Sequence, residues 1–170
     1  DGSREVVIIY ASRNDSAYVN EVRAMASNAR ITQLNFNFNR GSFFYRRNSD
    51  GSNGALVNIE ELMRTPSEKT FVVAAANETD VDRILTTLSS TKASIRGRGL
   101  RYGNYLTYGN NKWSRMNNLD HDIFYNNDVV FAVSYYANRI DESIRLFDAR
   151  FINDYGVLPT RNAYRGYDAA

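Results

Sequence analysis

The sequence has no cysteine and a single histidine, His121, among its 170 residues. The absence of cysteine excludes disulfide bonds, thiolate metal sites and cysteine nucleophiles. One histidine excludes a Cys/His zinc site and any mechanism that needs two imidazoles. No apolar stretch approaches the roughly 20 residues of a membrane-spanning helix. A chain of this length buries roughly 70% of its unfolded surface, so it needs no metal or disulfide to fold.

The sequence also lacks a strong excess of charge of either sign. It has 21 Lys and Arg residues against 19 Asp and Glu residues, a formal net charge of +2, which does not imply a polyanionic partner. Eighteen of the basic residues are arginine, and residues 96–103 (RGRGLRYG) resemble an RNA-binding RG segment. Because this tract is short and lies between two predicted elements, we interpret it as a connecting loop and expect no nucleic-acid partner.

Apolar, β-branched runs alternate with helically spaced apolar residues along the chain. Residues 6–10 (VVIIY), 70–76 (TFVVAAA) and 129–133 (VVFAV) are typical of strands buried on both faces of a parallel sheet. Residues 31–36 and 104–108 have weaker strand patterns. The alternation predicts an α/β fold with an open, mainly parallel five-stranded sheet and helices on both faces. Right-handed crossovers favour the flavodoxin-like strand order 2-1-3-4-5.

Residues 37–56 interrupt this alternation. Within them, residues 49–54 (SDGSNG) consist of turn-forming residues and show no hydrophobic period. The preceding aromatic cluster, residues 43–45 (FFY), suits either a short strand or a cover over a hydrophobic edge. We therefore expect residues 37–56 to be an exposed loop insertion.

The motifs of common α/β enzymes are absent. The turn at residues 11–17 (ASRNDSA) has neither glycine nor lysine, so it matches no Walker A loop or dinucleotide fingerprint. Residues 74–77 (AAAN) lack the aspartate that a phosphoacceptor site needs. The acidic pair Glu60–Glu61 begins a predicted helix, where carboxylates meet the helix dipole. Residues 120–122 (DHD) resemble a catalytic triad only as letters, because no Gly-x-Ser-x-Gly elbow exists. We expect no catalytic residues, no metal and no cofactor.

The final third of the chain carries a more specific pattern. Residues 147–156 read F-x3-F-x3-Y-G, and residues 163–169 read A-x2-G-Y-D-A after Pro159. Tyr108–Gly109 ahead of Trp113 looks like the exit from strand four in bacterial relatives. This arrangement resembles the type I periplasmic binding proteins of the leucine/isoleucine/valine-binding kind.

The resemblance implies that residues 1–170 form a single α/β lobe, the second lobe of a longer, two-lobed protein. It implies a non-enzymatic receptor that grips a small polar, amino-acid-like ligand in a cleft by closing against the missing lobe. The expected setting is ABC-type uptake, in the periplasm or lipid-anchored in the cell envelope, with a membrane permease or another envelope protein as partner.

Ligand-binding positions follow from the resemblance, because ligands of open parallel sheets sit outside the carboxyl ends of the strands. Donors after the first strand would suit a carboxylate, and polar groups after the third would suit an amine or hydroxyl. The expected ligand-facing residues are Arg13, Asn14, Asp15, Asn77, Asp80 and Tyr108, with Tyr135 and Tyr136 near the cleft or hinge.

The sequence departs from the family pattern in one informative place. Amino-acid receptors of this kind usually carry a Tyr-Gly pair after strand one, and residues 14–17 (NDSA) have none. The resemblance therefore does not extend to amino-acid specificity. Envelope proteins that join such a domain to a peptidoglycan-binding LysM module look similar. A second hypothesis is therefore a receptor-derived structural or protein-interaction domain of the cell envelope, associated with peptidoglycan and without a transport role. It would contact its partner through Phe43 and Phe44. An enzyme of flavodoxin-like fold is the third hypothesis.

Overall fold

The computed structural model describes residues 5–38, 43–65, 69–103, 105–116, 118–133 and 137–169. The chain forms two compact units, one up to Ala132 and one from Val133 onward. The boundary between the units falls within residues 129–133, the last strand that the sequence analysis predicts. In the described ranges, no helix is both long and apolar enough to cross a membrane.

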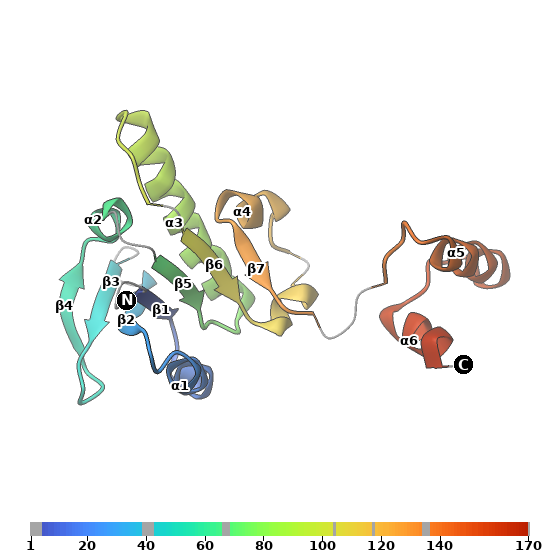
Figure 1. Cartoon of the computed structure of the whole chain (residues 1–170), viewed down its shortest axis with the longest axis horizontal. Helices are drawn as coiled ribbons and strands as arrows, with labels where there is room; N and C mark the ends of the chain where they lie inside the picture. Colours follow the sequence, from blue (N-terminus) through green and yellow to red (C-terminus); the bar gives the residue numbers. More distant parts are fainter. Residues whose placement is uncertain are drawn as a thin grey trace. The chain divides into compact units, whose positions relative to one another are not determined.

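A seven-stranded sheet is the framework of the first unit (Figure 1). Its order is β4-β3-β2-β1-β5-β6-β7. The last five strands in this order, β2, β1, β5, β6 and β7, pair in parallel. These five are the predicted strands in the predicted order, so the α/β fold class is confirmed. The strands are β1 (Glu5–Tyr10), β2 (Arg30–Asn37), β3 (Phe43–Arg47), β4 (Asn53–Val57), β5 (Lys69–Val73), β6 (Tyr105–Gly109) and β7 (Val129–Phe131).

The two additional strands come from residues 37–56, so the expectation of a loop was wrong for much of this segment. β3 pairs antiparallel with β2 and with β4, and the turn between β3 and β4 is short. Phe44, only 2% exposed, attaches this hairpin to the core by packing on Phe36, with ring centroids 5.2 Å apart. Phe44 is the one buried residue of these two strands, and a single anchor gives no detectable hydrophobic period.

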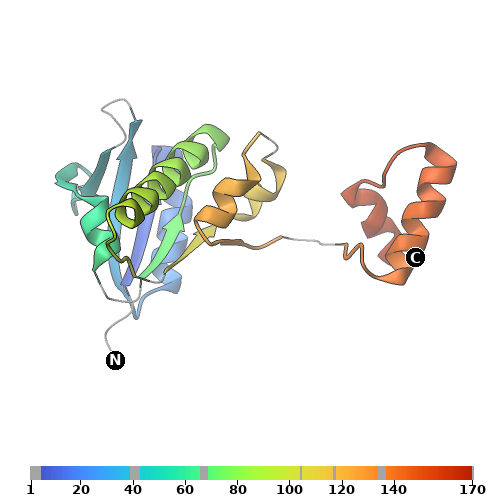
Figure 2. The same ribbon diagram turned by 90° about the horizontal axis from the view of Figure 1, so that it is seen from above.

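Helices cover both faces of the sheet in the first unit (Figure 2). Successive side chains of a strand point to opposite faces. Accordingly, Val7 and Ile9 join the larger core cluster with α3, whereas Ile8 and Tyr10 pack with Val19 of α1. This two-sided burial is why β1 reads as a continuous apolar run. The helices of this unit are α1 (Ser16–Met25), α2 (Ile59–Arg64), α3 (Glu78–Gly97) and α4 (His121–Asn126), with 3₁₀ helices η1 (Arg13–Asp15) and η3 (Asn111–Arg115).

The second unit contains α5 (Glu142–Tyr155) and α6 (Arg161–Ala169). Gly156 ends α5 in the left-handed conformation, with φ of 70°, as its position in the sequence predicts. The Phe147 ring stacks on Tyr167 at 4.5 Å between centroids, and the Tyr164 hydroxyl donates to Asp148 at 2.5 Å. Residues that carry the family resemblance therefore pack the two helices together.

Candidate functional site at the carboxyl-terminal edge of the sheet

Parallel strands place the segments that follow β1, β5 and β6 at one edge of the sheet. Arg13, Asn14 and Asp15 form η1 directly after β1, and Asn77 and Asp80 lie at the start of α3, after β5. Tyr108, in β6, exposes 38% of its surface. Six of the eight predicted ligand residues therefore gather at this edge. The other two, Tyr135 and Tyr136, lie outside the described residues.

Asp15 organises the turn after β1. It is 5% exposed, and its carboxylate accepts hydrogen bonds from the backbone N–H groups of Ala11 at 3.2 Å and Ser12 at 2.9 Å. The Ser12 hydroxyl accepts from the Asn14 N–H, and Ser12 and Asp15 form a capping box in which each side chain accepts from the other residue's backbone N–H. Asp15 is thus occupied by the backbone, and Arg13 and Asn14 are left exposed at the surface of the same turn.

Asn77 and Asp80 have different roles at the start of α3. The Asn77 side-chain oxygen caps the helix by accepting from the N–H groups of Thr79 at 2.9 Å and Asp80 at 3.3 Å. Among the described residues, no hydrogen bond or ion pair holds the Asp80 carboxyl. Burial raises the pKa of Asp80, the Asp15 charge raises it further, and Arg83 opposes both. Asp80 is therefore a partly buried carboxyl group beside a second carboxylate.

Contacts between loops stiffen this edge, and sequence reasoning assigned no role to them. The Trp113 indole N–H donates to the Ala75 carbonyl at 3.0 Å, and the Asn110 amide donates to the same oxygen at 3.2 Å. Trp113 is 1% exposed and lies against Gly109, where a Cβ atom would overlap the indole ring. The only feature of the sequence that pointed to these contacts was Tyr108–Gly109 ahead of Trp113, which the family resemblance had singled out. These bonds hold the segments after β5 and β6 together as one platform.

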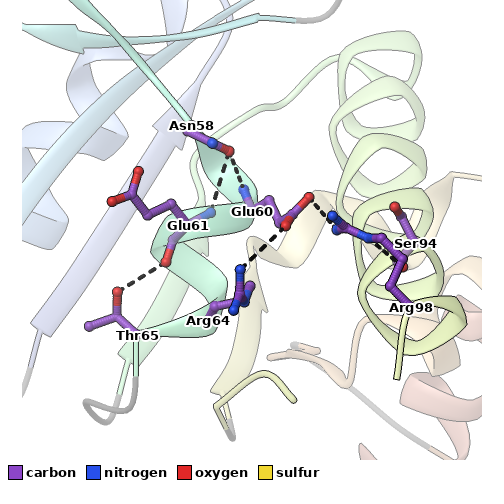
Figure 3. A network of polar contacts seen from close by, with 7 residues as sticks. All are labelled: Asn58, Glu60, Glu61, Arg64, Thr65, Ser94 and Arg98. Carbon is purple, nitrogen blue, oxygen red and sulfur yellow. Dashed lines mark hydrogen bonds and ion pairs between the residues drawn. The ribbon is translucent and has the colours of Figure 1, made fainter. Parts of the chain in front are cut away.

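Glu60 and Glu61, the acidic pair at the start of α2, belong to a separate polar network (Figure 3). Asn58 caps the helix, and Glu60 forms an ion pair with Arg98 at 2.6 Å. Arg98 belongs to the RG tract, and its neighbour Arg96 lies over the Tyr102 ring at 5.3 Å from the centroid. These contacts tie both arginines to the folded chain. Arg96 and Gly97 are the last residues of α3, so only residues 98–103 of the tract form the connection that the sequence analysis expected.

Comparison with known proteins adds no constraint: no protein-family model, curated protein or solved structure matches this chain. Within the described part of the chain, no group of three or more His, Cys, Asp or Glu side chains could hold a metal ion. What the strand-end surface can do must therefore be argued from its own geometry. It offers exposed cationic and amide donors at Arg13 and Asn14, and one incompletely compensated carboxyl group at Asp80.

Proposed function

We propose that the first unit recognises a small polar solute at the carboxyl-terminal edge of its sheet, as a lobe of a cell-envelope solute-binding protein. The observation that carries the proposal is the Asp80 carboxyl, which is half-buried beside Asp15 and has a raised pKa. A partly desolvated carboxylate that repels its neighbour gains most from an added cation. Arg13 and Asn14 are exposed and precede Asp15 in η1, so they suit an anionic group of the same ligand.

The pairing of these groups favours a zwitterionic, amino-acid-like solute. An ammonium group would neutralise Asp80, and a carboxylate would accept from Arg13 and from the Asn14 amide. Half of a cleft buries little of a ligand, so this chain by itself should bind weakly. Closure against a second lobe, uptake through a membrane permease and an envelope location belong to the same proposal, and they rest on the family resemblance.

Titration of the 15N-labelled 170-residue chain with glycine, L-leucine and L-lysine tests the proposal. We expect amide resonances of Asn14, Thr79 and Asp80 to shift with at least one of them. Asp80→Asn should weaken that binding at least tenfold, since it removes the group that meets the ammonium. Asp82→Asn, an exposed carboxyl on the same helix, is the matched control and should bind normally. Unmoved resonances at these positions, or equal losses in the two variants, would contradict the proposal.

A structural or peptidoglycan-associated role is the second candidate. The observation in its favour is the hairpin at the sheet edge, where Leu56 is 58% exposed and Phe43 42% exposed. Phe44 cannot contribute to such a surface, because it is buried. Co-sedimentation with purified peptidoglycan, reduced at least fivefold by Leu56→Asp, would favour this role. A chain that stays in the supernatant would exclude peptidoglycan association.

A further inference from the structure

A broad polar groove opens on the α1 side of the sheet, away from Asp80. Its volume is about 870 Å³, within the range of sites for ligands of several rings. Tyr10, Ile31 and Gln33 of β1 and β2 line its floor. One wall comes from η1 and α1, and the other from the β3–β4 hairpin, which extends the sheet beyond β2 (Figure 1).

The charge of the groove lining is strongly positive. The single acidic residue of the lining is Asp50, whose carboxylate accepts from the Ser52 N–H at 2.8 Å and the Ser52 hydroxyl at 2.6 Å. These bonds, with help from Arg47, lower the pKa of Asp50 and hold the carboxylate in its own turn. Within the described residues, no ion pair with a carboxylate engages the basic side chains of the lining. They are Arg13, Arg23 and Arg47. Arg46 also borders the groove, but it pairs with Leu34, whose side chain belongs to the core on the opposite face of the sheet.

Arg47 is fixed at the centre of this surface. Its Nη1 donates to the Tyr10 hydroxyl at 2.7 Å, and the guanidinium lies over the Tyr10 ring at 5.3 Å from the centroid. Gly51 packs against the same group, since a Cβ there would approach Arg47 Nη2 to 3.0 Å. A guanidinium held in place loses little side-chain entropy when a ligand accepts its remaining hydrogens.

The rest of the lining is rich in hydroxyl and amide groups. Tyr10 is the aromatic residue of the lining, and it is 4% exposed beneath Arg47, so it offers no open ring face for stacking. Nucleobases depend on such stacking, whereas sugar hydroxyls pair with hydroxyl and amide side chains. The hydroxyl and amide side chains of the lining on this face are Ser12, Ser16, Asn20, Gln33, Asn48 and Ser49.

We propose that this groove binds a polyhydroxylated oxyanion, a sugar acid or a sugar phosphate. The arginines would hold the carboxylate or phosphate, with bidentate bonds that suit either group. The hydroxyl and amide side chains would hold the polyol. This site overlaps the strand-end surface at Arg13 of η1 and otherwise uses different side chains. It does not depend on the function proposed above.

Calorimetry on the full 170-residue chain at low salt tests the site with four probes: glucuronate, glucose 6-phosphate, glucose and AMP. We expect glucuronate or glucose 6-phosphate to bind, glucose to bind at least tenfold more weakly, and AMP to bind no better than glucose 6-phosphate. The preferred anionic sugar identifies which oxyanion the arginines select. Affinity should fall at least threefold between 20 and 200 mM salt, because exposed charges are screened.

Variants separate this groove from the strand-end surface. Arg23→Gln changes an exposed side chain, so we expect the variant to fold. Combined with Arg47→Gln, it should lower the affinity for the anionic sugar at least tenfold. Arg150→Gln, an exposed arginine of α5, is the matched control and should bind normally, as should Asp80→Asn. Absence of binding by both anionic sugars, equal binding of glucose, tighter binding of AMP, or an unaffected Arg23→Gln/Arg47→Gln double variant would each overturn the inference.

Discussion

Two aspartates at the same edge of the sheet illustrate how neighbouring groups of one chemical type take different roles. Asp15 is satisfied by two backbone N–H groups, so its charge is compensated within the fold. Asp80 has no such bonds among the described residues, and its pKa is raised. A group that is costly to keep ionised in the folded chain is typical of binding and catalytic sites.

The raised pKa of Asp80 predicts a specific dependence of stability on pH. Between the unfolded pKa, about 4, and the higher folded pKa, the folded state binds more protons than the unfolded state. The free energy of unfolding should therefore fall as pH rises through this window and stay lower above it. Asp80→Asn should remove the fall, so its melting temperature should exceed that of the natural chain at pH 7 and match it at pH 3.

Thermal melts followed by circular dichroism from pH 3 to pH 8 measure this effect. Asp82→Asn, whose carboxyl is exposed, serves as the control and should follow the natural chain. If the melting temperatures of the Asp80→Asn variant and the natural chain changed in parallel with pH, Asp80 would not be the source of the pH dependence. A variant that is more stable yet binds solute more weakly would show that Asp80 is kept for recognition.

At the scale of elements, the β3–β4 hairpin contributes one side chain to the core and another to the polar groove. Phe44 points into the core beside Phe36, and Arg47, past an irregularity in the β3–β4 register, reaches Tyr10 at the floor of the groove. Phe44 thus attaches the hairpin to the core, and the attached hairpin positions Arg47 at the centre of the groove.

Serine substitutions at adjacent positions test this arrangement. Phe44→Ser should lower the free energy of unfolding by about 3–5 kcal/mol, because it removes a fully buried ring. Phe43→Ser, at a side chain 42% exposed, should cost less than about 1 kcal/mol. Urea denaturation followed by tryptophan fluorescence gives both values. Similar losses in the two variants would show that the hairpin is not anchored through Phe44.

At the scale of the whole molecule, the two units are built differently. Both core clusters and every strand of the sheet lie in the first unit. The second unit is a pair of helices joined by aromatic contacts and by the hydrogen bond from Tyr164 to Asp148. A sheet that is complete within residues 1–132, with its own core, has what a domain needs to fold alone.

We therefore expect residues 1–132 by themselves to fold. The shortened chain should unfold in a single cooperative transition and keep a dispersed NMR spectrum, with the anionic-sugar titration unchanged. Loss of cooperativity or of the dispersed spectrum would show that the sheet requires residues beyond 132. The full chain, studied in parallel, is the reference.

Prediction from sequence succeeded where local pattern and burial coincide. β1 and β5 were recognisable because two-sided burial demands unbroken apolar runs. The apolar run at residues 129–133 did predict a strand, but the expected burial on both faces was wrong, because β7 ends at Phe131 and Val130 is 43% exposed. The hairpin was missed because Phe44 alone carries its packing. The shared position of the expected ligand residues was predictable because parallel strands deliver their carboxyl ends to one edge, and their role in binding stays a prediction. Trp113 and Asn110 were not assigned a role, because both reach the carbonyl of Ala75, which is distant in sequence.

The sequence by itself determined the α/β class and the order of the five parallel strands, because local periodicity and the handedness of crossovers suffice for these. It also placed six residues at one edge of the sheet: Arg13, Asn14, Asp15, Asn77, Asp80 and Tyr108. Only the tertiary structure decided which of those side chains are occupied. It also brought Arg23 of α1 and Arg47 of β3 to one groove. Charge compensation and concavity arise between segments remote in sequence, and no local pattern encodes them.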